Sequence, residues 1–479
     1  MRALRDPFLI VIILLNLAIG SSTLTRGHEW GDDFASYIMQ AQSLLNGTPQ
    51  EFVQKNTFTI FNSSILIGPA AYPWGYPLIL TPALILKGVH PLTLKLPGLF
   101  FFAGFLICLY FMTSNRLTRI ESLLLVSVFA FNPTLIKFLD QILSDIPFLF
   151  FIFLGLFLIT KFKANTWNSI GFGIVIFLAF FIRTTGIILL GSFLVCQALC
   201  FYRQKEARKA ILINSIAVLF SFSLLWILTS LIFPNGQGSY FDQLKGLTPK
   251  IFKENISYYF SLFGIFFGSG PAWMYIFHGL IVLFLIASWQ RRNEDQLLII
   301  FFVSYLIAML FWPERQGIRF IFPLLPILIY LAIQGIRIVI NKLPEKYHLA
   351  GEMTMYGFWL LIVGTFLFGS GTRAYANLQD DRKINGPFDP YSSDIYNYIR
   401  ANTPPDSVVV FFKPRAMRLF TDHNTLMSLA CTRLPLGDYI VISKKAENSQ
   451  VPLNEIDKCG LALENLFENQ RFIVYKVPK

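Results

Sequence analysis

The chain has 479 residues, of which 54% are hydrophobic and only 14% are charged. Soluble globular proteins average about 25% charged residues, so the composition excludes an ordinary soluble enzyme and indicates a polytopic membrane protein. The formal net charge of +12 does not indicate a nucleic-acid partner, because cytoplasmic loops rich in lysine and arginine account for it.

The first apolar segment, residues 7–24, follows Arg2 and Arg5. Its length is close to the roughly 20 residues that a membrane span needs. It lacks an obvious cleavage site of the A-x-A type, which favours a retained span over a removed signal peptide. The two arginines predict a cytoplasmic N-terminus.

Two adjacent carboxylates, Asp32 and Asp33, come next, in a long first loop over residues 25–91. Apolar residues then recur at helical spacing over residues 34–45, with Asp33 predicted as the N-cap and Gly47 as the helix end. The pair has two interpretations at this stage. It either caps the helix and complements its dipole, or forms an acidic site just outside the membrane.

Further along the same loop, the aromatic stretch Tyr72-Pro73-Trp74-Gly75-Tyr76-Pro77 precedes a short apolar run, residues 78–86, that Pro82 interrupts. A run of this length is more often interfacial or re-entrant than membrane-spanning. The tyrosines and the tryptophan suit the depth of the lipid headgroups.

If this run does not cross the membrane, the apolar segments give about eleven spans. They are residues 7–24, 94–113, 121–135, 146–160, 169–182, 187–202, 211–233, 272–289, 297–312, 320–339 and 353–370. This count places nearly every basic cluster in the cytoplasm, as the positive-inside rule requires, and the C-terminal region outside. The prediction is a multi-pass protein of a bacterial inner membrane.

Under this topology eight charged residues lie at the outer membrane–water boundary: Asp32, Asp33, Asp140, Asp145, Arg183, Glu314, Arg315 and Arg319. Ionisable residues at membrane depth are costly and tend to mark function. Each also has a structural interpretation, such as a helix cap for Asp145 or a snorkelling anchor for Arg315 and Arg319. The acids could also hold a divalent cation, although nothing in the sequence requires one.

The charge pattern suits sugar transfer from a lipid phosphate. Arginines bind phosphate oxygens through charge-assisted hydrogen bonds, and a nearby carboxylate can take the proton of an incoming hydroxyl. Trp74 and Tyr76 could stack on a sugar ring. The alternative is a transporter or flippase of a lipid-linked or anionic substrate. Transporter sites, however, usually lie near the bilayer midplane between repeated halves, and here the span middles are nearly free of charge.

The order of these features resembles the membrane glycosyltransferases of the GT-C fold, particularly the protein O-mannosyltransferase and aminoarabinose transferase relatives. The matching motifs are Asp32-Asp33 with Tyr37, the aromatic stretch at residues 72–77, Ser144-Asp145-Ile146-Pro147, and Arg319-Phe320-Ile321-Phe322-Pro323-Leu324-Leu325-Pro326. The resemblance implies a polyprenyl-phosphate sugar donor, a glycan, lipid or protein acceptor, and transfer on the extracytoplasmic side.

The residue pattern and the resemblance together assign Asp32, Asp33 and Asp145 to catalysis. They assign substrate binding to Tyr37, Trp74, Tyr76, Asp140, Arg183, Glu314, Arg315 and Arg319. In relatives the second residue of the acid pair is often Glu, whereas this chain has Asp at both positions. Which of Asp32 and Asp33 is the base therefore stays open.

The predicted membrane domain covers residues 1–371, and residues 372–479 form a polar region that is expected outside, beside the active site. A helix over residues 394–401 and strands over 408–412, 439–443 and 472–477 predict a small α/β domain. Cys431 and Cys459 could pair if this region is extracytoplasmic. Lys413, Arg415 and Arg418 either contact a substrate or form a solvated basic loop.

Overall fold

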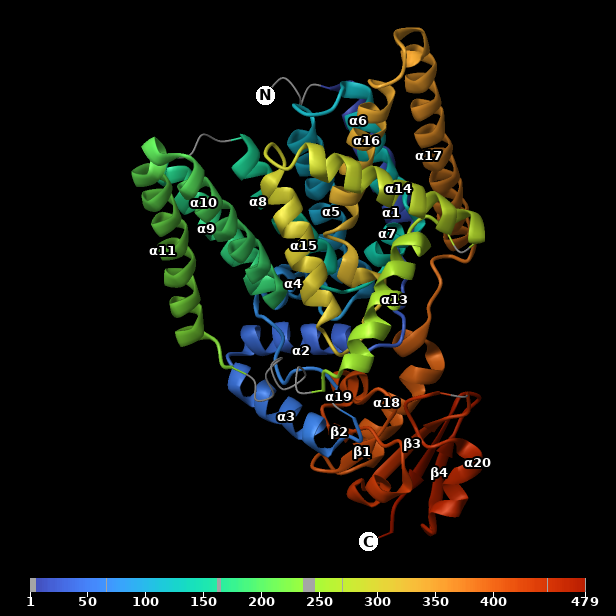
Figure 1. Ribbon diagram of the computed structural model, residues 1–479. Helices are drawn as coiled ribbons and strands as arrows, with labels where there is room; N and C mark the ends of the chain where they lie inside the picture. The colour runs from blue at the N-terminus through green and yellow to red at the C-terminus, as the bar shows by residue number, and fades with distance from the viewer. Residues whose placement is uncertain are drawn as a thin grey trace.

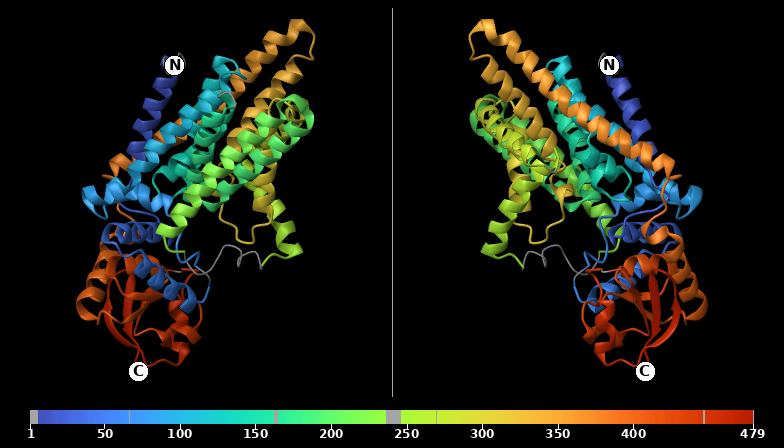
Figure 2. Two further views of the ribbon diagram at one scale, coloured as in Figure 1. Left: turned by 90° about the vertical axis from the view of Figure 1, so that its left-hand side faces the viewer. Right: turned by 90° about the vertical axis from the view of Figure 1, so that its right-hand side faces the viewer.

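The computed structural model describes residues 6–65, 67–161, 165–235, 246–268, 270–445 and 447–478. A bundle of apolar helices forms one end of the molecule and a small sheet domain forms the other (Figures 1 and 2). Arg2, Arg5 and Lys163, three of the basic residues behind the predicted topology, lie outside the described residues.

Each of the eleven predicted spans corresponds to a helix or a helix pair. The bundle consists of α1 (Pro7–Thr23), α5 (Pro91–Thr113), α6 (Arg119–Phe131) with α7 (Pro133–Leu139), α8 (Asp145–Lys161), α9 (Thr166–Ile182), α10 (Ile187–Arg203), α11 (Arg208–Ile232), α14 (Pro271–Gln290), α15 (Gln296–Leu310), α16 (Leu325–Ile340) and α17 (His348–Gln379). Among the described residues, five helices are long and apolar enough to cross a membrane by length and composition alone. The pair α6–α7, bent by 54° at Pro133, makes a sixth.

Small residues let the helices of the bundle approach closely. A Cβ at Gly335 of α16 would lie 2.2 Å from the carbonyl oxygen of Leu283 in α14, and one at Gly173 of α9 would lie 2.1 Å from Oγ of Ser221 in α11. In membranes, where lipid is as apolar as a leucine side chain, such close backbone packing is a main source of helix association.

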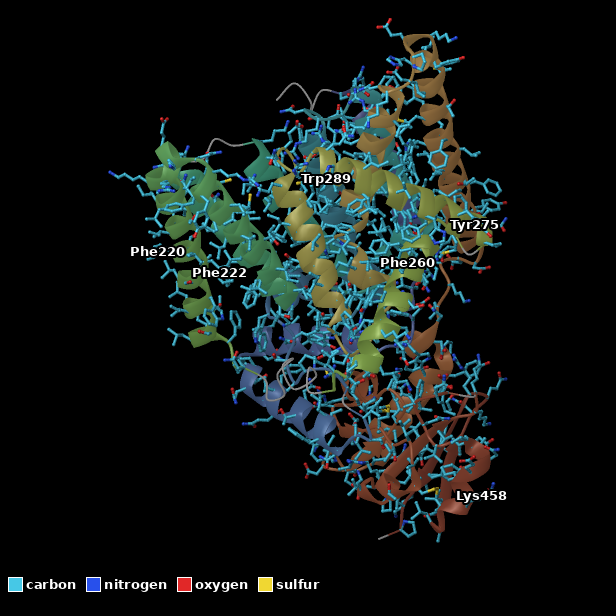
Figure 3. The ribbon with its side chains drawn as sticks, in the orientation of Figure 1. Phe220, Phe222, Phe260, Tyr275, Trp289 and Lys458 are labelled. Atoms are coloured by element: carbon cyan, nitrogen blue, oxygen red, sulfur yellow. A yellow bond between two sulfur atoms is a disulfide. The ribbon has the colours of Figure 1, made fainter. Side chains whose placement is uncertain are left out.

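The outer face of the bundle is apolar. On α11, Phe220 is 63% exposed, whereas Phe222 is buried against Phe177 and Phe180 of α9 (Figure 3). A helix that exposes large apolar side chains along its length is suited to lipid rather than water. This face therefore fits the predicted membrane domain.

The first loop contains three helices, α2 (Asp33–Asn46), α3 (Pro49–Asn62) and α4 (Gly75–Lys87). Helices α2 and α3 lie between the bundle and the sheet domain (Figure 1). The short apolar run is α4, whose 13 residues include Pro82. At 1.5 Å per residue it is about 20 Å long, less than the roughly 30 Å hydrocarbon core. A further helix, α13 (Pro249–Ile265), was not predicted.

The sheet domain follows α17, which continues through the predicted domain boundary at residue 371 to Gln379. Its elements are α18 (Pro390–Asn402), β1 (Val408–Val410), α19 (Pro414–Thr421), β2 (Asn424–Leu426), β3 (Tyr439–Ser443), α20 (Leu453–Ile456), β4 (Glu464–Glu468) and β5 (Phe472–Lys476). The sheet order is β2-β1-β3-β5-β4. β1 runs parallel to β2 and β3, and β5 runs antiparallel to β3 and β4.

Cys431 and Cys459 form a disulfide in this domain. The helix and the three strands that the sequence predicts are present, with β1 two residues shorter at its end than expected, and β2 and β4 are additional. The predicted α/β class of the C-terminal region is therefore confirmed.

Candidate active site

Asp32 and Asp33 stand at the start of α2, and their side chains have different partners. Asp32 occupies the N-cap position, yet its side chain makes no capping hydrogen bond. Asp33 is the first residue of the helix, so the prediction of Asp33 as the N-cap is wrong by one position. Helix capping therefore does not explain why this loop carries two carboxylates.

Asp33 is bound by a tyrosine and an arginine. The Tyr72 hydroxyl donates to its Oδ1 over 2.6 Å, and Nη1 of Arg319 donates to its Oδ2 over 2.9 Å. Burial alone would raise the pKa of Asp33, but the Arg319 charge and these two hydrogen bonds outweigh it, so the pKa is lowered below its ordinary value. Asp33 is therefore held as a carboxylate.

The same arginine also reaches the carboxylate at the start of α8. Nη1 of Arg319 lies 4.0 Å from Oδ2 of Asp145. Asp145 in turn forms an ion pair with Arg183, whose guanidinium lies over the ring of Phe320 at 5.3 Å from the centroid. Four charged residues that the sequence predicts at one boundary, Asp33, Asp145, Arg183 and Arg319, are thus brought together.

Three of these charges, Asp33, Arg183 and Arg319, border a small cavity of about 70 Å³. Its lining comes from the first loop, the turn after α9 and the segment between α15 and α16, and includes Asp33, Tyr37, Tyr72, Arg183, Thr184, Thr185, Gln316 and Arg319. A larger cavity of about 360 Å³ lies elsewhere, between the ends of α8 to α11 that are remote from Asp145, and its lining is mainly apolar. The charged side chains therefore line the smaller cavity and not the larger one.

Asp32 instead contacts the sheet domain. The backbone N–H of Arg415 in α19 donates to Oδ1 of Asp32 over 3.1 Å, and Nζ of Lys413 lies 3.8 Å from Oδ2. Burial raises the pKa of Asp32 above its ordinary value, although Lys413 and Arg415 oppose this shift. Arg415 and Arg418 are both buried, so their interpretation as a solvated basic loop is wrong.

No protein-family model matches the chain, and no curated protein matches its sequence. Solved structures, however, match nearly its whole length. ArnT from Cupriavidus metallidurans bound to undecaprenyl phosphate aligns over 97% of each chain with a TM-score of 0.58 and 13% identity. The Archaeoglobus fulgidus oligosaccharyltransferase in its apo form aligns over 99% of this chain and 74% of its own, with a TM-score of 0.63 and 11% identity.

The chain has the GT-C fold. The fold that the sequence motifs suggest is therefore confirmed, together with the helical membrane class and the small C-terminal domain. At 11–13% identity these alignments show the fold alone.

The three aromatic residues predicted to bind substrate are all buried. Tyr37 lines the cavity, where its hydroxyl is 2.9 Å from Oγ of Ser144. The Tyr76 ring packs edge-on against Tyr37, with 4.8 Å between the ring centroids. The Trp74 ring stacks on Phe233 with 5.4 Å between the centroids, so this face of the indole is occupied by the protein and not free for a sugar.

Three of the predicted charges contact other partners. Asp140 is buried and pairs with Lys95 over 2.7 Å, a contact that fixes the beginning of the first loop. Arg315 donates to Glu254 over 2.7 Å, and this pairing holds it on α13. Glu314 contacts Gln316, and burial raises its pKa. None of these three residues is among those that border the cavity.

The site also includes Tyr72 and Gln316, which the prediction omitted, and Lys413 and Arg415, which it named as possible substrate contacts but did not link to the acid pair. Tyr72 lies in the aromatic stretch that the sequence singles out, so a signal for it was present. Its hydroxyl packs against Gly68, where φ is +67° and a Cβ would lie 2.9 Å from the hydroxyl oxygen. Nothing local to Lys413 and Arg415 could link them to residues almost 400 positions earlier.

The described residues contain no group of three or more histidine, cysteine, aspartate or glutamate side chains that could hold a metal ion. The histidine near the acid pair has a structural role. Nε2 of His28 accepts a hydrogen bond from the backbone N–H of Ile142 over 3.0 Å, and Nδ1 lies 2.7 Å from the carbonyl oxygen of Glu29. Burial lowers the pKa of His28 to about 3, so the ring is neutral and holds two loops together.

Proposed function

We propose that this chain is a membrane glycosyltransferase that moves a sugar from a polyprenyl-phosphate donor to an acceptor hydroxyl. The observation that carries the proposal is the position of Arg319 between Asp33 and Asp145 at the edge of a cavity. A carboxylate held ionised next to two arginines provides both the base and the positive charge that this reaction needs.

Asp33 is the base in this proposal, and Asp32 is not. Asp33 lines the cavity and its side chain is 30% exposed, whereas the Asp32 side chain is 9% exposed and bound to α19. A general base has to lie within hydrogen-bond reach of the hydroxyl proton that it removes. Of the two carboxylates, Asp33 is the one that an acceptor in the cavity can reach.

The proposed step balances as a displacement at the anomeric carbon. The acceptor hydroxyl loses its proton to Asp33 and its oxygen forms a bond to the sugar. The bond between the sugar and the phosphate oxygen breaks, and its electron pair leaves with the polyprenyl phosphate. Arg319 and Arg183 stabilise the negative charge that grows on the phosphate.

Donor binding requires the cavity to open. A volume of about 70 Å³ holds only a few water molecules, since each occupies roughly 30 Å³ in the liquid. In the structure, Arg319 and Arg183 are paired with Asp33 and Asp145. An entering phosphate would replace part of these ion pairs. The two arginines would thus pair with carboxylates before the donor binds and with the phosphate afterwards.

The fold supports the class of donor. ArnT of Cupriavidus metallidurans was solved with undecaprenyl phosphate, and the Archaeoglobus fulgidus AglB with dolichol phosphate and an inhibitory peptide, aligned over 88% of this chain and 64% of its own with a TM-score of 0.55 and 11% identity. A polyprenyl-phosphate sugar is therefore the donor that we propose. The acceptor is a hydroxyl of a glycan, a lipid or a protein.

We place the site on the extracytoplasmic face. The disulfide between Cys431 and Cys459 supports this, because disulfides persist in oxidising compartments. The sheet domain that carries it contacts the acid pair directly, so the two share one side of the membrane. The basic helix ends at Arg116, Arg203 and Arg291 then fall in the cytoplasm, in agreement with the positive-inside rule.

The test is transfer of a labelled sugar by membranes that contain the full-length chain. Asp33→Asn keeps the shape of the side chain and removes the base, so we expect transfer to fall by a factor of about 100 or more. Asp381→Asn is the control, because Asp381 forms an exposed ion pair with Arg26 away from the cavity. Full activity of the Asp33 variant would refute the proposed role.

A further inference from the structure

We propose that Arg415, carried by the C-terminal sheet domain, is a positioning residue that holds the acid pair and Tyr72 in their working arrangement. The inference rests on the proposed function and deepens it. It makes the sheet domain a part of the active site, in addition to being a neighbour of it.

Arg415 is fully buried, and its backbone N–H and its guanidinium donate to the first loop. Its backbone N–H donates to Asp32 over 3.1 Å, and Nη1 donates to the Tyr72 hydroxyl over 3.3 Å. Nη2 donates to the carbonyl oxygen of Pro69 over 2.7 Å, and Nε donates to Oδ1 of Asn56 over 3.1 Å. One residue thus contacts Asp32 directly and Asp33 through a single tyrosine.

The positive charge of Arg415 is not neutralised by direct pairing. In the described parts of the chain, no carboxylate forms an ion pair with its guanidinium. A buried charge of this kind is expensive, which calls for a reason why it is present. Its charge opposes the rise that burial causes in the pKa of Asp32 and contributes to the lowered pKa of Asp33, so it acts on the acid pair.

A simple tether between the domains would not need Arg415. Arg418, one turn further along α19, donates to Thr59 over 3.1 Å and to Asn56 over 2.9 Å. Arg433 donates to the carbonyl oxygen of Asn62 over 2.9 Å. These two arginines already tie the sheet domain to α3, and neither contacts the acid pair. Arg433 therefore provides a matched control for an arginine that only joins the domains.

Several charged or titratable groups face the acid pair from the elements around it. The membrane domain contributes Asp145, Arg183, Glu314 and Arg319, and the first loop contributes His28, Tyr37 and Tyr72. The sheet domain contributes Lys413 and Arg415. Because only Lys413 and Arg415 come from the sheet domain, variants of Arg415 test what this domain contributes to the acid pair.

The first measurement is the dependence of transfer on pH in the full-length protein. Arg415→Met removes the charge, so we expect the acid limb of kcat to move upward by about one pH unit. We also expect kcat to fall by a factor of about ten or more, because the Tyr72 hydroxyl loses its guanidinium donor, while the backbone N–H of residue 415 still donates to Asp32. Arg415→Lys keeps the charge and should return the acid limb to its original position. Arg433→Met should leave both kcat and the limb unchanged.

The second measurement reads the carboxyl groups without using activity. Carbodiimides react with protonated carboxyls, so labelling of the peptide that contains Asp32 and Asp33, followed against pH by mass spectrometry, reports their ionisation. We expect the labelling midpoint to rise in Arg415→Met and to stay constant in Arg433→Met. A single symmetric peak in size-exclusion chromatography and a thermal midpoint close to that of the wild type show that a variant has folded.

The two measurements separate the two proposals. If the wild type transfers no sugar from any polyprenyl-phosphate donor, the proposed function fails, and the labelling midpoints still decide the role of Arg415. If folded Arg415→Met keeps the wild-type acid limb and labelling midpoint, the positioning role is wrong. An equal effect of Arg433→Met would also overturn it, because it would reduce Arg415 to a tether.

Discussion

Arg319 donates a 2.9 Å hydrogen bond to Asp33, across 286 positions of the chain. The contact joins the start of α2 to the segment between α15 and α16. The same guanidinium nitrogen lies 4.0 Å from Asp145 at the start of α8. One cation therefore meets two acids from two distant segments of the chain, and this arrangement gives the site its proposed chemistry.

Replacing Arg319 should affect the chemical step. Arg319→Met removes the charge that stabilises the departing phosphate, and losing one such group typically costs a factor of about 100 to 1,000 in kcat. Arg319→Lys keeps a positive charge but loses the planar guanidinium, so we expect its kcat to lie between that of the wild type and that of Arg319→Met. Steady-state transfer kinetics with a labelled donor measure the effect.

Arg315→Met is the matched control for this prediction. Arg315 precedes Arg319 by one helical turn in the sequence, yet it contacts Glu254 and Asn255 on α13. We expect its kcat to remain within about threefold of the wild type, as a largely exposed pair contributes little. An equal loss in both variants would show that the segment is needed only for folding.

The hydroxyl of Tyr72 should set the lower pH limit of activity. The proposed base works as a carboxylate, and the bond from Tyr72 helps to lower the pKa of Asp33. Tyr72→Phe removes this bond, so the pKa rises and activity is lost at a higher pH when the solution is acidified. We expect the acid limb of kcat to move upward while the rate at neutral pH changes less. A limb that stays in place, or moves downward, would contradict the role of Tyr72.

The sequence predicted the parts of the site that its local patterns encode. Charge between apolar segments located Asp33, Asp145, Arg183 and Arg319 at one boundary, because lipid makes buried charge costly wherever it occurs. The same rule also selected Asp140 and Arg315, which the structure pairs with Lys95 and with Glu254. A charge at the boundary shows that a partner is needed, but it does not show which partner.

Contacts between distant segments could not be predicted in this way. The bond between Arg415 and Asp32 spans 383 positions, and no periodic pattern connects α19 to the first loop. For Trp74, the sequence predicted an aromatic ring at headgroup depth that could stack on a sugar, but the ring stacks on Phe233 at the end of α11. Both outcomes depend on tertiary packing, which a single sequence does not reveal.

We expect the buried Asp32 carboxylate to lower the free energy of unfolding at neutral pH. Burial raises its pKa in the folded state, so keeping it ionised above that pKa costs free energy that the unfolded chain does not pay. Asp32→Asn keeps an oxygen for the N–H of Arg415 and removes the charge. We therefore expect a higher thermal midpoint than the wild type at pH 7. In acid, where Asp32 is protonated in both states, the difference should disappear.

Thermal unfolding of the purified variant at several pH values measures this effect. Asp381→Asn, at an exposed position, controls for the general loss of one negative charge. A variant that is less stable than the wild type at pH 7 would mean that the pairing of Asp32 with Lys413 outweighs the cost of burial, opposite to the sign expected here.

We expect the buried ion pair of Lys95 and Asp140 to have a structural role, although the sequence predicted that Asp140 binds substrate. Nζ of Lys95 lies 2.7 Å from Oδ1 of Asp140 and donates to the carbonyl oxygens of Thr25 and Gly27. Asp140→Ala leaves a buried ammonium without its carboxylate, which typically costs about 3 kcal/mol or more. We expect a clearly lower thermal midpoint, while the folded fraction keeps its KM for the donor.

The double variant Lys95→Met with Asp140→Leu removes both charges and should recover much of the lost stability, because a buried ion pair often contributes little beyond an apolar pair of similar size. Thermal midpoints of the two single variants and the double variant form a cycle that isolates the interaction between the charges. If folded Asp140→Ala instead shows a higher KM for the donor and no loss of stability, Asp140 contributes to substrate binding and the structural role is wrong.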